Sequence, residues 1–237
     1  MKYLNSGNAK TIKGEKLGWK TYGIHLAPFK VSGHLTCQWA SKGCAMACLN
    51  TAGRGIMSNV QSARIAKTVL LFEQKEIRLE QIWKEITSAI KSAKHLNLKP
   101  CFRLNLTSDI PWESSEWFIN GLSIFDHFPG VQFYDYTKGR KRYAAFLRGE
   151  MPANYHLTYS RSEKSTDDLM SQGFLASGGN VAVVFRGKLP TTWKGFPVVN
   201  GDESDLRFLD GKGVIVGLVE KGLAKKDSTG FVVEPVS

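Results

Sequence analysis

The stretch "CFRLNLTSDIPWESSEWFINGLSIFDHFPGVQFYDYT" (101–137) sets the fold expected of this chain. It begins and ends with runs rich in aromatic and other apolar residues, "CFRLNLT" (101–107) and "VQFYDYT" (131–137), which predict two strands. Between them, "SSEWFINGLSIFDHF" (114–128) opens with serines placed to cap a helix and predicts a helix. A strand, a helix and a second strand in this order predict two parallel strands joined by a crossover.

The same alternation extends in both directions along the chain. Further strands are predicted at 22–29, 155–160, 180–186, 196–199, 213–219 and 231–235, and further helices at 58–76, 79–96, 141–149 and 165–174. The pattern predicts an α/β fold with mostly parallel strands, arranged as a full or partial (β/α) barrel, with an open doubly wound sheet as the alternative. Either arrangement gathers ligands at the carboxyl ends of the strands.

The domain organisation expected from the sequence is simple. The chain has no internal repeat, no low-complexity tract and no linker rich in Pro, Gly or Ser. We therefore predict a single domain over 1–237, in which 1–22 is a basic N-terminal extension.

The charge of the chain favours anionic partners. Lys and Arg number 32 against 21 Asp and Glu, so the formal net charge is +11. The excess is concentrated in the first thirty residues and in "KGRKRYAAFLR" (138–148). This excess predicts a partner that carries phosphate or carboxylate, such as a nucleotide or a nucleic acid; the alternative is a solvated basic surface.

The start of the chain, "MKYLNSGNAK" (1–10), lacks the apolar core of a signal peptide. No apolar run approaches the ~20 residues that span a bilayer. The sequence thus predicts no membrane partner and a cytoplasmic location. In a reducing cytosol, clustered cysteines are more often metal ligands or reactive thiols than disulfides.

Three of the four cysteines lie within twelve residues, in "CQWASKGCAMAC" (37–48). Cys37, Cys44 and Cys48 follow the predicted strand 22–29 with the spacing C-x6-C-x3-C. Three thiolates predict a [4Fe–4S] cluster with one iron open to another ligand, since such clusters normally take four thiolates. The alternatives are a zinc site with His34 as fourth ligand, and thiols that hold no metal. Cys101 is a candidate distant ligand but is better explained as a buried thiol.

A cysteine loop placed after the first strand resembles the layout of radical S-adenosylmethionine (SAM) enzymes. The C-x6-C-x3-C spacing is more similar to a family of uncharacterised phage proteins, a radical-SAM-like group. Further stretches that resemble this family are "RLNLTSD" (103–109), "PGVQFYDYTK" (129–138) and "YHLTYSRS" (155–162). The resemblance implies a radical-SAM-like barrel, a [4Fe–4S] cluster with SAM at the open iron, and the host cell cytoplasm as location.

Residues at the predicted strand ends are the candidate cofactor ligands. Ser108 and Asp109 follow the strand 101–107, and Asp109 is a candidate to bind a ribose hydroxyl or the amino group of SAM; the alternative is a cap of the following helix. Ser160 and Arg161 follow the strand 155–160, where an Arg can bind a carboxylate or phosphate or face solvent.

"GVIVGLVE" (213–220) resembles a motif of radical SAM enzymes in which a strand contacts adenine. The resemblance implies that Ile215 and Gly217 bind the cofactor. The alternative is a core strand whose glycine permits a close approach of neighbouring atoms.

The sequence therefore predicts an iron–sulfur protein, a radical-SAM-like enzyme whose substrate is not specified. The alternative is a non-catalytic nucleic-acid-binding protein with a structural zinc or iron–sulfur site. No G-x-S-x-G, P-loop or H-E-x-x-H motif is present, so hydrolase, NTPase and metalloprotease functions have no support.

Overall fold

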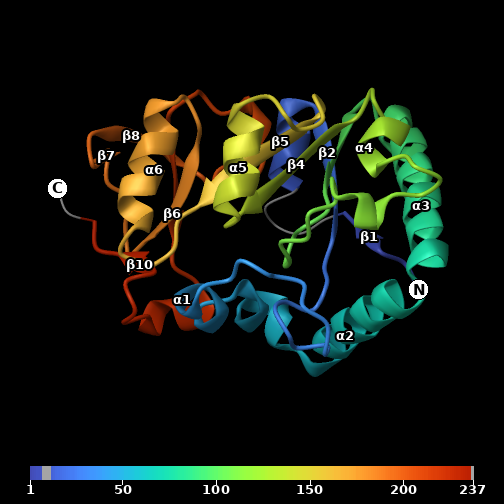
Figure 1. The fold of residues 1–237 in the computed structure, drawn as a ribbon, viewed down its shortest axis with the longest axis horizontal. Helices are drawn as coiled ribbons and strands as arrows, with labels where there is room; N and C mark the ends of the chain where they lie inside the picture. Colours follow the sequence, from blue (N-terminus) through green and yellow to red (C-terminus); the bar gives the residue numbers. More distant parts are fainter. Residues whose placement is uncertain (7–11, 236–237) are drawn as a thin grey trace. The chain divides into compact units, whose positions relative to one another are not determined.

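The computed structural model describes residues 1–6 and 12–235, so Lys10 of the predicted basic extension lies outside the described residues. Strands and helices alternate along the chain, as the sequence predicts (Figure 1). The strands are β1 Leu4–Asn5, β2 Trp19–Ile24, β3 Lys99–Arg103, β4 Gln132–Thr137, β5 Tyr155–Ser160, β6 Val181–Phe185, β7 Thr192–Trp193, β8 Phe196–Asn200, β9 Ile215–Val219 and β10 Val232–Val233. The α-helices are α1 Lys42–Met46, α2 Ser58–Glu73, α3 Lys75–His95, α4 Ile124–His127, α5 Arg140–Leu147 and α6 Asp167–Ala176.

The predicted barrel is wrong, because the strands form an open mixed sheet. Its neighbour order is β1-β2-β3-β4-β5-β6-β9-β8-β7, with β10 paired to β6 off this path. A closed barrel requires the strands at the two ends of the sheet to pair with each other. Among the described residues, the outer edge of β2 is covered by antiparallel β1, and β8 pairs on its far side with antiparallel β7. The prediction of mostly parallel strands is confirmed.

The chain divides into two compact units. Unit 1 comprises 1–38, 58–135 and 151–156, and unit 2 comprises 39–57, 136–150 and 157–237. Part of the predicted basic extension 1–22 lies in the sheet of unit 1, where Leu4 and Asn5 pair with Ile24 and Gly23.

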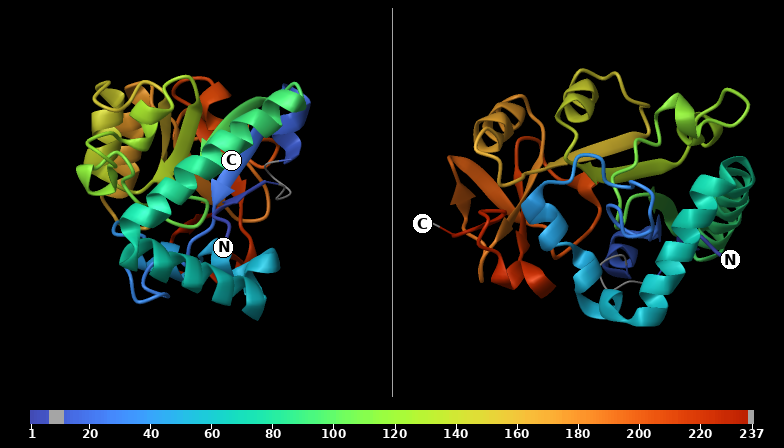
Figure 2. Two further views of the ribbon diagram at one scale, coloured as in Figure 1. Left: turned by 90° about the vertical axis from the view of Figure 1, so that its right-hand side faces the viewer. Right: turned by 60° about the horizontal axis from the view of Figure 1, so that its bottom comes forward.

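Unit 1 is built on the parallel pair β2 and β3. Tyr22 stacks on Phe102 with ring centroids 5.5 Å apart, and Phe102 lies 5.6 Å from Phe133 of β4. Helix α3 lies against the strands of unit 1 (Figure 2, left), and it has an apolar stripe along one face. The buried members of that stripe are Leu79, Ile82, Ile86, Ala89 and Ala93. Their 3- and 4-residue spacing is that of one helix face, which explains why this segment forms an amphipathic helix.

Unit 2 is built on β6 and β9, which are buried along most of their length. Helix α6 lies against β6, and α5 lies beside α6 on the same face of the sheet (Figure 1). Tyr143 of α5 and Phe174 of α6 meet edge to face with centroids 4.9 Å apart, and both contact Tyr159 of β5. Aromatic pairs of this geometry add to the apolar burial that holds the helices on the sheet.

The single helix predicted over 114–128 is also wrong. A turn breaks it at Asn120 and Gly121, which have φ angles of 51° and 78°. The residues on either side, Ile119 and Leu122, form an isolated antiparallel bridge. Two successive positive φ values are typical of an Asn-Gly turn and incompatible with a right-handed helix, so only the short helix α4 forms after the turn.

Candidate functional site

Cys37 lies in unit 1, on a loop that folds back onto the end of β2. The N–H of Thr36 donates to the carbonyl oxygen of Phe29 at 3.0 Å, and the buried Thr36 hydroxyl donates to the carbonyl of Ala27 at 2.7 Å. These bonds bring the Cys37 Sγ to 3.3 Å from the N of Phe29 and 3.9 Å from the carbonyl oxygen of Thr107. The half-buried Cys37 thiol therefore stands at the carboxyl ends of β2 and β3, with an N–H directed at its sulfur.

Cys44 and Cys48 lie in unit 2, on and just after helix α1. Ser41 caps this helix, and its Oγ accepts the N–H of Cys44 at 3.2 Å. Cys48 follows one turn later and begins a short 3-10 helix. Both thiols are half-buried, and Cys48 lies just beyond the helix, which ends at Met46.

Glu163 fixes the start of α1. Its carboxylate accepts the Ser41 hydroxyl at 2.5 Å and the N–H of Gly43 at 2.8 Å. Burial raises the pKa of Glu163, but the hydrogen bonds from Ser41 and Gly43 and the charge of Lys138 outweigh it and hold the pKa below its usual range. The carboxylate is thus ionised at the helix end where a negative charge is favourable.

Gly43 is required where α1 meets the end of the chain. A Cβ built on Gly43 would lie 2.7 Å from the Phe231 Cβ and 2.8 Å from the Glu163 carboxylate. No side chain larger than hydrogen fits at these distances. The glycine therefore allows the cysteine-bearing helix to pack directly against the 229–231 segment.

The structure gives the remaining candidate metal ligands separate surroundings. Cys101 is fully buried beside the Thr21 hydroxyl at 3.3 Å, as expected of a buried thiol. His34 stacks on the Phe72 ring with centroids 4.7 Å apart. A search of the described residues finds no group of three or more His, Cys, Asp or Glu side chains that could hold a metal ion. The cluster and the zinc site remain predictions from the sequence.

Ser108 and Asp109 are fixed by their own loop in unit 1. The Ser108 hydroxyl donates to Asn105 Oδ1 at 2.8 Å, and the N–H of Asp109 donates to the carbonyl of Thr36 at 2.8 Å. No helix starts directly after Asp109, and the next short helix is preceded by Ser114. The alternative role of Asp109 as a helix cap is therefore wrong.

Asn105, which sequence reasoning missed, organises this loop. Its Oδ1 accepts from the N–H of Ile110 at 2.9 Å and from the indole N–H of Trp112 at 3.2 Å, in addition to Ser108. Its own N–H and Nδ2 donate to the buried carboxylate of Asp135 at 2.8 and 3.2 Å. The sequence does offer a signal for this role, since Asn105 is an amide within the mostly apolar run 101–107. A buried amide needs hydrogen-bond partners, so such a residue is expected to organise the groups around it.

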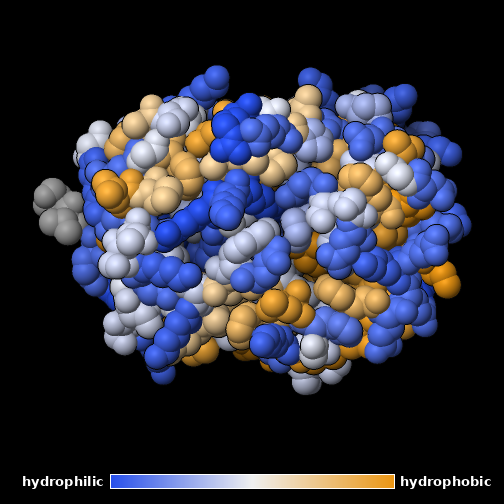
Figure 3. All heavy atoms as spheres, in the orientation of Figure 1, coloured by the Kyte–Doolittle hydropathy of each residue, from blue (hydrophilic) through white to orange (hydrophobic). Residues whose placement is uncertain are grey.

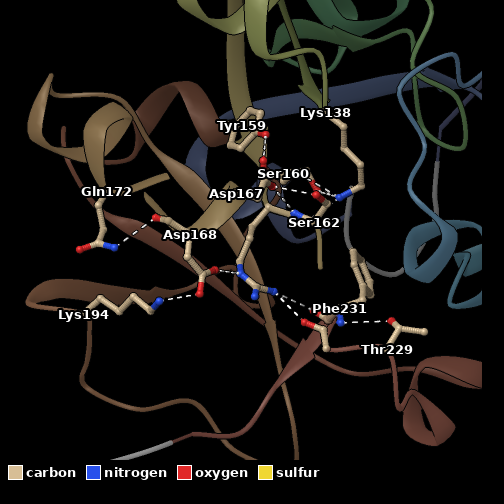
Figure 4. A network of polar contacts seen from close by, with 12 residues as sticks. Lys138, Tyr159, Ser160, Ser162, Asp167, Asp168, Gln172, Lys194, Thr229 and Phe231 are labelled. Carbon is tan, nitrogen blue, oxygen red and sulfur yellow. Dashed lines mark hydrogen bonds and ion pairs between the residues drawn. The ribbon is translucent and has the colours of Figure 1, made fainter. Parts of the chain in front are cut away.

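In unit 2, Ser160 belongs to an internal polar network (Figure 4), and hydrogen bonds join Arg161 to the same network. Lys138 Nζ donates to the carbonyl and hydroxyl oxygens of Ser160 at 3.1 and 3.0 Å, and to the Arg161 carbonyl at 2.7 Å. The Lys138 ammonium also lies 4.8 Å from the centre of the Phe231 ring. Ser160, predicted to bind a cofactor, is therefore held by Lys138.

The Arg161 guanidinium is largely buried and meets carboxylate and carbonyl groups of the chain itself. Its Nε lies 2.5 Å from Asp168, and its Nη1 donates to the Gly230 carbonyl at 2.9 Å. It also lies 5.8 Å from the Trp193 ring centre. The carboxylate that Arg161 meets comes from α6, and binding of a ligand carboxylate or phosphate by Arg161 stays a prediction.

Asp167, a second residue that sequence reasoning missed, is fully buried at the start of α6. Its carboxylate accepts from the Tyr159 hydroxyl at 2.6 Å, from Arg140 Nε at 3.0 Å and from the Ser162 N–H at 2.6 Å. These bonds satisfy a buried charge and join β5, α5 and α6.

Ile215 and Gly217 lie on β9, between β6 and β8. Ile215 is fully buried, and a Cβ on Gly217 would come within 2.7 Å of Val198 and 2.9 Å of Leu189. This packing fits the core-strand alternative. The adenine contact implied by the resemblance stays a prediction.

The basic stretch 138–148 has largely internal partners, although hydrophilic residues cover much of the face in Figure 3. Besides Lys138, Arg140 pairs with Asp167 at 2.8 Å and Arg142 lies 5.7 Å from the Trp39 ring centre. Arg148 pairs with Glu150 at 2.6 Å. Several of these charges therefore stabilise unit 2, whereas the sequence predicts that they bind an anionic partner or face solvent.

None of the helices in the described part of the chain combines the length and the apolar character needed to cross a membrane.

Comparison with known proteins gives one match. The model of a family described as gene product 88 matches residues 2–235. No curated protein and no solved structure matches the chain. The match agrees with the expected phage protein family and adds no ligand, cofactor or reaction.

Proposed function

We propose that this chain, which belongs to the gene product 88 family, binds an iron–sulfur cluster through Cys37, Cys44 and Cys48. The observation that carries the proposal is the grouping of three half-buried thiols within twelve residues. Cysteine thiolates are the usual ligands of such clusters, and a cytosolic protein has little use for them as disulfides.

The local structure of each cysteine supports this role. The N–H of Phe29 points at the Cys37 sulfur, and hydrogen bonds to a charged form stabilise that form. Glu163 and Ser41 hold the helix that carries Cys44 in one position. The chain therefore directs one N–H at the Cys37 sulfur and holds the helix that carries Cys44.

Three ligands leave one iron for a small molecule, and we propose SAM in that position. A reduced cluster supplies one electron to a ligand on its open iron. The proposed contacts of SAM are Ser108 and Asp109 in unit 1, and Ser160, Ile215 and Gly217 in unit 2. The proposed reaction class is radical-SAM-like chemistry on an anionic substrate such as a nucleotide or nucleic acid, which the net charge of +11 favours.

The test is anaerobic reconstitution of the full chain with iron and sulfide. We expect visible thiolate-to-iron absorbance, about four irons per chain, and an electron paramagnetic resonance signal of the reduced protein that changes when SAM is added. Cys44→Ser abolishes the absorbance, whereas the matched control Cys101→Ala, outside the loop, retains it.

Two results overturn the proposal in different ways. One equivalent of zinc without iron absorbance excludes the cluster. If a cluster forms but its spectrum does not change when SAM is added, the proposed metal site stands and the radical-SAM-like activity is excluded.

The net charge also supports a second candidate, a nucleic-acid-binding protein in which zinc or a cluster is structural. It predicts DNA or RNA binding that weakens with salt and survives Asp109→Ala. It also predicts that Cys44→Ser lowers both the unfolding temperature and the affinity for DNA or RNA. Because most charges within 138–148 already have partners in unit 2, this second candidate relies on basic residues elsewhere in the chain.

A further inference from the structure

Two segments of unit 2 meet at its surface. One is 42–57, which comprises helix α1 and the 3-10 turns that follow it, and the other is 221–226, which forms a further 3-10 turn. A Cβ built on Gly222 would lie 2.9 Å from the Ala52 Cβ and 2.9 Å from the Thr51 carbonyl oxygen. The two segments therefore touch, although they are distant in the sequence.

Further contacts hold both segments in place. Ala47 and Ala224 are buried in one apolar cluster, which anchors the two backbones to the core of unit 2. Gly55 is buried beside the preceding turn, where an added Cβ would lie 3.1 Å from the Leu49 carbonyl oxygen. Residues 42–57 and 221–226 thus form one continuous surface, which we term the α1 surface.

The α1 surface exposes large apolar side chains around this contact. Leu49 begins the turn that contains Thr51, and Leu223 follows Gly222 directly. The apolar side chains that are at least 50% exposed on the two segments are Met46, Leu49, Ile56, Met57 and Leu223. A single exposed apolar side chain is normal, whereas a group carried by touching segments is typical of an interaction site.

The charge of the α1 surface has one sign. Neither segment contains Asp or Glu. The exposed cations of the two segments are Lys42, Arg54, Lys221, Lys225 and Lys226. Lys221 pairs with Asp202 at 2.7 Å, and among the described residues the other four cations form no ion pair. The surface therefore favours a partner that carries negative charge.

Two carboxylates next to the α1 surface are engaged within unit 2. Asp227 accepts the N–H of Val232 at 2.9 Å and the Thr229 hydroxyl at 2.7 Å. Burial raises the pKa of Asp227, but these hydrogen bonds outweigh it and hold the pKa below its usual range. Glu163 accepts the N–H of Gly43 in the same way. The oxygens of both carboxylates thus bind the chain itself, which leaves the exposed cations to an external partner.

We propose that the α1 surface docks an acidic protein, through a segment in which Asp or Glu side chains flank apolar ones. Carboxylates of the partner complement the four cations, and its apolar side chains cover Leu49, Leu223 and their neighbours. Met46 and Met57 suit this role, because the flexible methionine side chain adapts to irregular surfaces and is enriched at protein interfaces.

Other occupants fit the α1 surface less well. Single-stranded nucleic acids stack their bases on aromatic rings, and neither segment contains an aromatic residue. Helices that lie in a membrane surface are long and amphipathic, whereas no helix of these segments exceeds the five residues of α1. A second copy of the chain would bring the same cations face to face, and like charges repel.

The proposal goes beyond the cluster and does not depend on it, although α1 carries Cys44. The variants that test it leave every cysteine in place, and peptide binding is measured separately from iron content. Failure of iron incorporation therefore leaves the docking surface standing, and the two proposals fail in different experiments.

The test is selection of a random peptide library against the full chain, followed by calorimetry with synthetic copies of the enriched peptides. We expect enriched sequences that combine Asp or Glu with Leu, Ile or Phe, and affinities that fall as the salt concentration rises. Leu49→Ser and Lys225→Glu should each weaken binding by about tenfold or more.

Matched controls lie at the other end of strand β9, which separates them from 221–226. Leu209→Ser and Lys212→Glu make the same changes at exposed positions of unit 2 before this strand, and their affinities should stay at the wild-type value. Equal weakening in the controls overturns the proposal, because the effect is then one of general charge or apolar exposure.

A second measurement uses only the wild-type protein and so covers variants that fold poorly. Amide hydrogen exchange should slow within 42–57 and 221–226 when an enriched peptide binds, and protection confined to other segments overturns the proposal. An empty selection, or enriched peptides without acidic residues, overturns it as well. Binding of phosphatidylserine vesicles or of an oligonucleotide that is lost in Leu49→Ser and Lys225→Glu assigns the surface to a membrane or a nucleic acid instead.

Discussion

The carboxylate of Glu163 lies 2.8 Å from the backbone N of Gly43, and it adds to the Ser41 cap of the helix that carries Cys44. Residues 120 positions apart are joined by this contact, so the cysteine helix depends on the loop after β5. Removal of the carboxylate should loosen the helix without touching a thiol.

Glu163→Ala tests this dependence. We expect the free energy of unfolding to fall by about 1–3 kcal/mol, the usual effect of losing hydrogen bonds to a charged group. The iron content after reconstitution should fall with it. Chemical unfolding and metal analysis measure the two effects. Glu150→Gln alters a surface ion pair with Arg148 and should change neither; equal loss in both variants would contradict the role of Glu163.

The pH dependence of this contact has a defined direction. Because the pKa of Glu163 is below its usual value in the folded protein, its contribution is complete above the unfolded value. It is lost as the pH falls through the folded pKa. The free energy of unfolding of Glu163→Ala should therefore fall less steeply with decreasing pH than that of the wild type. Unfolding curves of the two proteins at a series of decreasing pH values measure the difference.

His25 predicts a second pH effect. Its pKa is about 4 in the folded protein against 6.5 in the unfolded chain. Above the unfolded value both states are neutral; between the two values only the unfolded chain binds the proton, so stability falls with falling pH. The loss reaches roughly 3 kcal/mol at about 1.4 kcal/mol per pKa unit.

Urea unfolding between pH 7 and pH 4 measures this loss. His25→Gln should reduce the slope of stability against pH in this range. His95→Gln, at an exposed position on α3, should leave the slope as it is in the wild type. A slope that survives in His25→Gln assigns the effect to other groups.

Asn105→Asp should be strongly destabilising although it changes few atoms. The new carboxylate would face Asp135, and the Nδ2 donor between them would be lost. We expect a loss of about 2–4 kcal/mol, in the range of a broken buried network. Thermal unfolding monitored by tryptophan fluorescence reports it. The exposed Asn59→Ala should cost within about 0.5 kcal/mol; similar losses in the two variants would contradict a special role for Asn105.

Gly43→Ala should destabilise unit 2 by about 1–3 kcal/mol, because a methyl group at this position overlaps Phe231. Gly130→Ala is the matched control, since a Cβ there has nothing within 4 Å. Differential scanning calorimetry of both variants makes the comparison. A tolerated Gly43→Ala would show that the 229–231 segment moves aside.

Local pattern predicted most elements of this fold because each depends on neighbouring residues. The runs at 180–186 and 213–219 became β6 and β9, and the amphipathic pattern at 79–96 became α3. The predicted helix at 114–128 failed because the apolar residues on the two sides of the Asn120–Gly121 turn pack separately. Trp117 contacts Trp112, whereas Phe125 stacks on Tyr155. The Asn-Gly pair is typical of a turn, but the spacing of the apolar residues on both sides of it favoured a single helix.

Features that depend on pairing between distant segments were not accessible from the sequence. Coverage of the β2 edge by Leu4 and Asn5 excludes a closed barrel, yet two residues give no strand pattern. The three cysteines of the loop could be identified from the sequence because they lie within twelve residues of one another.

The bonds of Asn105 have a consequence for ligand binding. They fix the backbone from Asn105 to Trp112 in the protein alone, with Ser108 half-buried and Asp109 buried in the loop. A molecule that contacts this loop does not have to order it, and ordering a loop is one of the main entropic penalties of association. If a ligand binds at this edge of the sheet, as proposed, it should require little rearrangement of the 105–112 backbone.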